Sequence, residues 1–95
     1  MEFKRDNCTF IIPERPTVRQ QMMWFSAVSG SDKTKSLERY WEGAKALIEK
    51  WESSALPDYK ISLDAITDPS QTSIVIWAGI QVLDFMNGLE DIPKN

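Results

Sequence analysis

The sequence contains no histidine, so the side chain most often used for proton transfer near neutral pH is absent. Neither a Ser–His nor a Cys–His nucleophilic pair can therefore form. The four glycines are isolated from one another, and no glycine-rich loop is available to hold a phosphate. Asp58, Asp64 and Asp68 offer carboxylates, but their spacing is not that of an EF-hand and Asp68 is better explained as a helix cap. We expect no catalysis, no bound metal and no cofactor.

Cysteine, runs of basic residues and long apolar runs are also scarce. The single cysteine, Cys8, excludes an internal disulfide and fits a reducing compartment. The 11 Lys and Arg residues are scattered, and the formal net charge of -3 argues against nucleic-acid binding. No apolar signal region follows Met1, and the run 74–80 is too short to span a bilayer. The sequence therefore predicts a cytoplasmic protein that binds neither nucleic acid nor membrane.

Large aromatic side chains are abundant by contrast, with four tryptophans among 95 residues. Each tryptophan falls in a stretch with helical spacing of apolar residues. Aromatic side chains supply much contact area, so this composition indicates packing and binding rather than chemistry. The chain length supports one domain, residues 1–95.

The apolar pattern predicts a mainly α fold, a small three-helix domain with a short N-terminal β-hairpin. The predicted elements are a hairpin arm at 1–13 and helices at 17–29, 36–54 and 68–90. Thr17 and Gln20 have the spacing of a capping box at the start of the first helix. Asp68 and Pro69 have the residue types of an N-cap and a first helical position. Residues 58–67 fit either a short strand or one helical turn.

The second predicted helix carries the clearest apolar stripe. Its members recur at intervals of three and four residues: Leu37, Tyr40, Trp41, Ala44, Leu47, Ile48 and Trp51. The third predicted helix is apolar on two sides, which is typical of a central helix packed from both. The predicted core is Trp41, Leu47, Ile48, Trp51, Ile74, Ala78, Val82 and Phe85.

The first predicted helix has more large apolar side chains than one buried stripe requires. Val18, Met22, Phe25 and Val28 form a stripe that we expect to face the core. Met23, Trp24 and Ala27 remain on another side, either covered by the hairpin or exposed to a partner. Phe10 lies in the second hairpin strand, whose edge at residues 9–12 is suited to adding a partner strand. The predicted partner-binding residues are Phe10, Met23, Trp24 and Ala27.

Several segments together resemble the small tail assembly chaperones of tailed bacteriophages. The resemblance is carried by Ile12-Pro13 with Pro16-Thr17-Val18-Arg19, by Tyr40-Trp41 with Ala44, Leu47-Ile48 and Trp51-Glu52, by Ile76-Trp77-Ala78, and by the closing Ile92-Pro93-Lys94-Asn95. It implies a small helical protein of the host cytoplasm that self-associates as a homo-oligomer and binds the tape measure protein during tail assembly. The family has no active-site residues to carry over.

Two other classes remain open at this stage. One is a small phage or bacterial regulatory protein that binds a host protein through its acidic surface. The other is a structural tail or head-completion component that stays in the particle.

Overall fold

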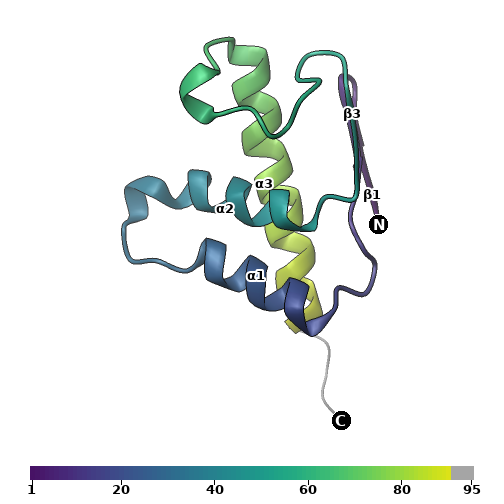
Figure 1. Cartoon of the computed structure of the whole chain (residues 1–95), viewed down its shortest axis with the longest axis vertical. Helices are drawn as coiled ribbons and strands as arrows, with labels where there is room; N and C mark the ends of the chain where they lie inside the picture. Colours follow the sequence, from purple (N-terminus) through teal and green to yellow (C-terminus); the bar gives the residue numbers. More distant parts are fainter. Residues whose placement is uncertain (91–95) are drawn as a thin grey trace.

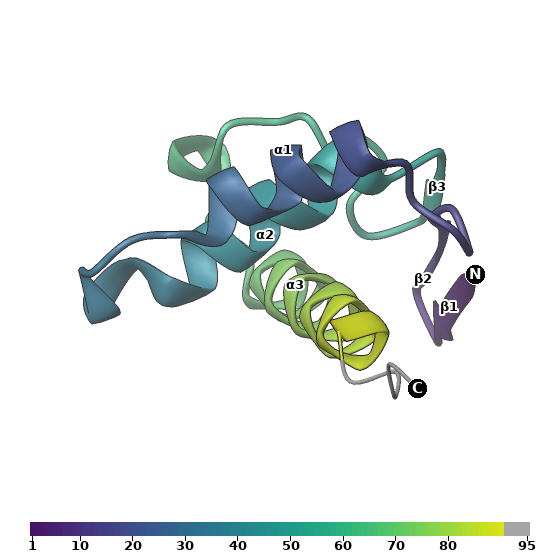
Figure 2. The same ribbon diagram turned by 90° about the horizontal axis from the view of Figure 1, so that it is seen from below.

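The computed structural model describes residues 1–90, and their elements are arranged as Figure 1 shows. In chain order these are β1 (Glu2–Arg5), β2 (Cys8–Ile11), α1 (Val18–Val28), a 3₁₀ turn (Lys33–Lys35), α2 (Ser36–Leu47), β3 (Lys50–Ser53), a second 3₁₀ turn (Leu63–Ala65) and α3 (Pro69–Glu90). Helices α1 and α2 lie side by side, and α3 crosses them. The strands lie beyond the C-terminal end of α2 (Figures 1 and 2).

The prediction of a mainly α fold is wrong, because a third strand joins the hairpin. β3 pairs antiparallel with β2, and the strand order is β1-β2-β3. The chain therefore combines three helices with a three-stranded antiparallel sheet, an α+β arrangement. β2 is the central strand and is paired on both sides, so the edge predicted at residues 9–12 is not free.

The second helix ends at Leu47 instead of continuing to residue 54. Ile48 has an extended backbone (φ -65°, ψ 121°), and the Glu49 N–H donates to the Ile11 carbonyl at 2.8 Å. Trp51 fits the helical spacing of α2, but it also alternates with Lys50 and Glu52 as a strand residue would. Pairing with β2 decides between the two periodicities, which is tertiary context overriding local pattern.

A row of aromatic side chains crosses the inner face of the sheet, one from each strand. Phe3 lies opposite Phe10, which lies opposite Trp51, with ring centroids 5.0 and 5.6 Å apart. α3 packs against this row through Trp77, edge-on to Phe10 at 5.4 Å, and Phe85, edge-on to Phe3 at 6.3 Å. Such pairs stabilise beyond their buried area, and here they hold the sheet on α3.

The core lies between α2, α3 and the sheet. Helix α3 approaches α2 closely at Gly79, where an added Cβ would lie 3.0 Å from the Trp41 backbone nitrogen. Of the predicted core, five residues are buried and three are partly buried. The buried ones are Trp41, Leu47, Ile74, Ala78 and Val82, and the partly buried ones are Ile48, Trp51 and Phe85.

Helix α3 is, among the described helices, the one long and apolar enough by length and composition to cross a membrane. It was not expected to be, since the prediction considered only the uninterrupted run 74–80. Its 21 residues from Pro69 to Leu89 have a mean hydropathy of 1.2 in the most apolar window, and 33% of that window is buried. α3 packs against α2 and, through Trp77 and Phe85, against the sheet, so part of its apolar surface is covered within the protein.

The predicted cap of α1 is confirmed. The Gln20 N–H donates to Thr17 Oγ1 at 3.1 Å, and the Thr17 N–H donates to Gln20 Oε1 at 2.8 Å. At the start of α3, Asp68 accepts from the Ser70 N–H at 2.9 Å. These contacts satisfy backbone donors that each helix leaves unpaired at its first turn.

Candidate functional site: an apolar groove between α1 and α3

Helix α1 turns a different side to the core from the one predicted. Trp24 is only 4% exposed, and its ring and Val28 lie over Gly43 of α2. Gly43 has no side chain, so it leaves room for an indole at the contact between α1 and α2. Val18 and Met22, like Phe25, were predicted to face the core. The structure instead leaves Val18 72% exposed and Met22 66% exposed.

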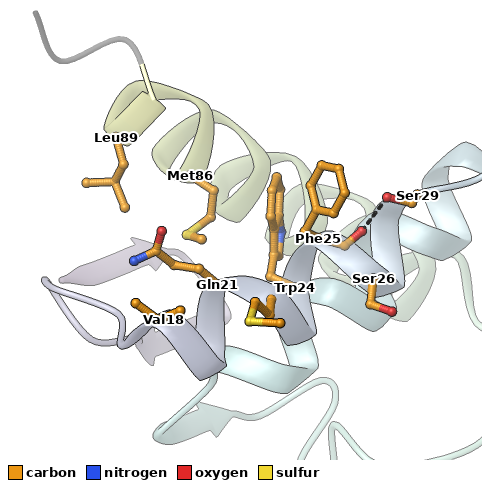
Figure 3. A pocket seen from close by; sticks show the side chains of 9 residues that line it. Val18, Gln21, Trp24, Phe25, Ser26, Ser29, Met86 and Leu89 are labelled. Carbon is orange, nitrogen blue, oxygen red and sulfur yellow. Dashed lines mark hydrogen bonds between the residues drawn. The ribbon is translucent and has the colours of Figure 1, made fainter. Parts of the chain in front are cut away.

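The exposed stripe of α1 forms one wall of an apolar groove. Phe25, 61% exposed, continues the stripe, because Met22 and Phe25 follow Val18 by four and seven residues. The groove has a volume of about 770 Å³ and is lined by Val18, Gln21, Met22, Trp24, Phe25, Ser26 and Ser29 of α1 and its C-cap, and by Met86 and Leu89 of α3. In Figure 3, Met86 extends from α3 toward Gln21 and Trp24.

The second wall is the C-terminal half of α3. Met86 and Leu89 are three residues apart and therefore share one side of the helix. Met86 is 4% exposed and Leu89 is half-buried, so the wall is supported by the core and only its outer part is open. Trp24 lies between the two walls as part of the lining, and its ring packs against Gly43 of α2. The groove is thus a preformed apolar surface on a packed scaffold.

Among the described residues that line the groove, none is charged. Two of its polar side chains donate to nearby backbone carbonyls, whereas the buried Trp24 Nε1 has no hydrogen-bond partner among the described residues. Gln21 Nε2 donates to the Pro16 carbonyl at 2.9 Å, and Ser29 Oγ donates to the Phe25 carbonyl at 2.6 Å. The described lining residues supply mainly apolar contact area.

The four residues predicted to bind a partner do not form one surface. Phe10 is fully buried in the aromatic row of the sheet, and Trp24 is nearly buried beneath the groove. Met23 is 50% exposed but does not line the groove, and Ala27 is half-buried. Large apolar side chains are exposed on this helix, but Val18, Met22 and Phe25 among them were predicted to face the core, and Trp24, predicted to bind a partner, is buried.

The lining residues that sequence reasoning missed carried a weak signal. The spacing of Val18, Met22 and Phe25 indicates an apolar stripe, and the sequence of this helix is apolar on both sides. Which side faced inward depended on Gly43 in another helix, a contact that the pattern of α1 alone does not encode. Met86 and Leu89 were among neither the predicted core residues nor the predicted partner-binding residues.

Other reactive groups do not form a site. Among residues 1–90, no group of three or more His, Cys, Asp or Glu side chains is placed to hold a metal ion. Burial raises the pKa of the Cys8 thiol from 9.0 to about 11, outweighing the opposing effects of Ser53 and Arg5. A thiol with a raised pKa is poorly nucleophilic at neutral pH, so Cys8 is a packing residue. The Ser70 hydrogen bonds lower the pKa of Asp68, consistent with its role as a cap.

Comparison with known proteins returns no match to a protein-family model, to a curated protein or to a solved structure.

Proposed function

We propose that the protein is a non-enzymatic assembly chaperone that binds an amphipathic helix of a partner protein in the groove between α1 and α3. The observation that carries this is the exposure of Val18, Met22 and Phe25 on one side of α1, opposite Met86 and Leu89 of α3. Large apolar side chains so exposed on a soluble protein mark contact surfaces.

The spacing of the exposed residues fits a helix better than an extended segment. Val18, Met22 and Phe25 occur at i, i+4 and i+7, the repeat with which two helices interdigitate. A helix laid between the α1 and α3 walls would contact both and cover the part of Trp24 that lines the groove. Met22 and Met86 have flexible thioether side chains, which suit binding of several related helical segments.

The charges beside the groove favour a partner with acidic residues. Arg19 is exposed on α1, which contains no acidic residue, and Arg15 is exposed just before it. Acidic side chains flanking the apolar stripe of a bound helix would approach these guanidinium groups and increase the rate of association.

The resemblance to tail assembly chaperones supplies the candidate partner, the tape measure protein of a tailed phage. A long helical protein exposes apolar stripes before its assembly is complete, and a chaperone that covers them prevents aggregation. On this proposal the chain acts in the host cytoplasm, associates with further copies of itself and leaves before the particle is finished.

The test is co-expression with a candidate tape measure protein, a long helix-rich protein from a neighbouring reading frame, followed by measurement of soluble complex. Phe25→Asp places a charge in the groove at an exposed position, so the fold should persist while co-purification falls at least tenfold. The matched control is Leu37→Asp, which places the same charge at a 47% exposed residue of α2 outside the groove, and binding should be retained.

The alternatives give different outcomes in the same experiment. If Phe25→Asp binds as well as the wild type, the groove is not the binding site. A chain retained in purified particles would be a structural component, and a chain that binds a host protein but not the tape measure would be a regulator. Either result would overturn the chaperone proposal.

A further inference from the structure

One edge of the sheet is unpaired, and its backbone groups point outward in a defined pattern. Met1 and Ile12 exchange hydrogen bonds, from the Met1 amino group at 2.8 Å and from the Ile12 N–H at 3.0 Å. In an antiparallel ladder such pairs alternate, so Phe3 and Arg5 also face β2. The N–H and C=O groups of Glu2 and Lys4 therefore point away from β2. Within residues 1–90, no strand pairs with this side of β1.

The same two residues carry the exposed charges of the strand. The side chains of Glu2 and Lys4 are exposed, whereas Phe3 and Arg5 point to the inner face and are partly buried. Arg5 is held there by a contact with the Trp77 ring at 5.4 Å. The free edge thus presents one acidic and one basic residue, each with outward-facing backbone groups, on either side of Phe3.

We propose that β1 pairs antiparallel with β1 of a second copy about a two-fold axis at Phe3, which joins the two sheets into one. Glu2 of each copy then lies opposite Lys4 of the other, and the two residues exchange backbone hydrogen bonds. This assigns a surface to the self-association included in the proposed function, and it does not involve the groove.

Two independent requirements select this register. A two-fold axis perpendicular to the sheet keeps the inner faces of both copies on the same side. Residues that point to the inner face must then lie opposite inner-face residues of the other copy, and outward residues opposite outward ones. A register centred on Glu2 would place two carboxylates face to face, and one centred on Lys4 would place two ammonium groups face to face. Only the register centred on Phe3 pairs opposite charges, and it is also one in which the outward backbone groups meet.

The inner face gains an aromatic contact in this arrangement. Phe3 is partly buried, stacked on Phe10 at 5.0 Å and edge-on to Phe85, with its outer side at the sheet edge. Placing Phe3 opposite the same residue of the second copy puts two rings at a position without ladder hydrogen bonds, where side chains come closest. The aromatic row would then continue from one copy to the other.

The opposite edge, β3, is less suited to the same pairing. The backbone groups of Ile11 and Thr9 point away from β1 and toward β3. Lys50 and Glu52 lie opposite these two residues, so their own backbone groups point toward β2 and are not free. If β3 paired with β3 of a second copy, Lys50 would lie opposite Glu52 only in the register centred on Trp51. In that register the outward backbone groups that meet are those of Trp51 alone. Beyond it the chain turns back, with the Leu56 N–H donating to Ser53 Oγ at 3.0 Å.

The experiment measures the dimer dissociation constant by sedimentation equilibrium, using protein with a native Met1 amino group. Lys4→Glu and Glu2→Lys each place like charges opposite one another twice per dimer, and each should raise the constant about tenfold. The double variant Glu2→Lys with Lys4→Glu exchanges the charges and should restore the constant to within about twofold of wild type. Glu2 and Lys4 are both exposed, so circular dichroism of these variants should be unchanged.

Matched controls separate this surface from the others. Lys50→Glu makes the same charge change on the β3 edge and should leave the dimer intact, as should the groove variant Phe25→Asp. A monomeric wild type at the highest soluble concentration overturns the proposal. So does a double variant that fails to restore association, or dissociation by Lys50→Glu or Phe25→Asp. Charge variants that lower partner binding but not self-association would mean that β1 takes a partner's strand instead. Loss of tape-measure binding with an intact dimer would affect the groove proposal alone.

Discussion

Replacing Gly43 with alanine tests how α1 is held on α2, and therefore how the groove is shaped. A Cβ at Gly43 would lie 2.8 Å from Trp24 Cδ1 and 2.8 Å from Val28 Cγ1. Neither atom is at the end of a flexible side chain, because the indole is rigid and valine is branched at Cβ. Either α1 must shift or the Trp24 and Val28 side chains must leave their rotamers, a change that costs about 1–3 kcal/mol in a packed interior. Alanine also favours the helix by about 1 kcal/mol over glycine, which would hide part of the loss.

A second glycine provides the control for that gain. Gly88 lies in α3, and a Cβ added there would meet no atom within 4 Å. Gly88→Ala has the same chemistry without the clash, so it should be neutral or stabilising by up to about 1 kcal/mol. Urea denaturation followed by tryptophan fluorescence gives both free energies of unfolding. We expect Gly43→Ala to be less stable than Gly88→Ala by about 1–3 kcal/mol. Equal stability of the two variants would show that Trp24 does not rest on Gly43.

Two further outcomes follow from the cap of α1 and the buried thiol. Thr17→Ala should lower the free energy of unfolding by about 0.5–2 kcal/mol, measured by urea denaturation, because it removes the acceptor of the Gln20 N–H; an unchanged midpoint would contradict the capping box. Cys8 should resist a thiol reagent such as Ellman's at pH 8 in the native protein and react at once in urea. Because its folded pKa of about 11 exceeds the ordinary 9.0, the unfolded state loses its proton first, and stability should fall as pH rises from 9 to 11, a decline that Cys8→Ala should reduce.

Local signals in the sequence were read more reliably than tertiary ones. The capping residues Thr17 and Gln20 act within one turn of helix, and the structure contains their hydrogen bonds as the spacing predicted. The turn at Asp6–Asn7 joins β1 to β2, again a contact between neighbours in the chain. Such features depend on residues a few positions apart, which the sequence presents directly.

The errors arose where distant segments decide. Trp51 satisfied a helical repeat and a strand alternation equally, and pairing of Lys50–Ser53 with β2 decided the outcome. The side of α1 that faces inward depended on the small residue Gly43 in α2. The groove was missed for the same reason, since Val18 and Met22 are exposed only because Trp24 occupies the contact with α2.

The central position of β2 has a consequence for the nascent chain. Its second neighbour, β3, is synthesised only after both α1 and α2, so the hairpin emerges long before its sheet can be completed. At ordinary elongation rates the ribosome needs about 2–10 s to reach Ser53 from Ile11. During that interval an isolated hairpin is only marginally stable, and Phe10 lacks the Trp51 and Trp77 rings that later enclose it. When ribosomes are closely spaced on the messenger RNA, many incomplete hairpins are therefore close to one another. Slower initiation at low temperature spaces the ribosomes further apart, so it should raise the yield of soluble protein more than faster elongation would.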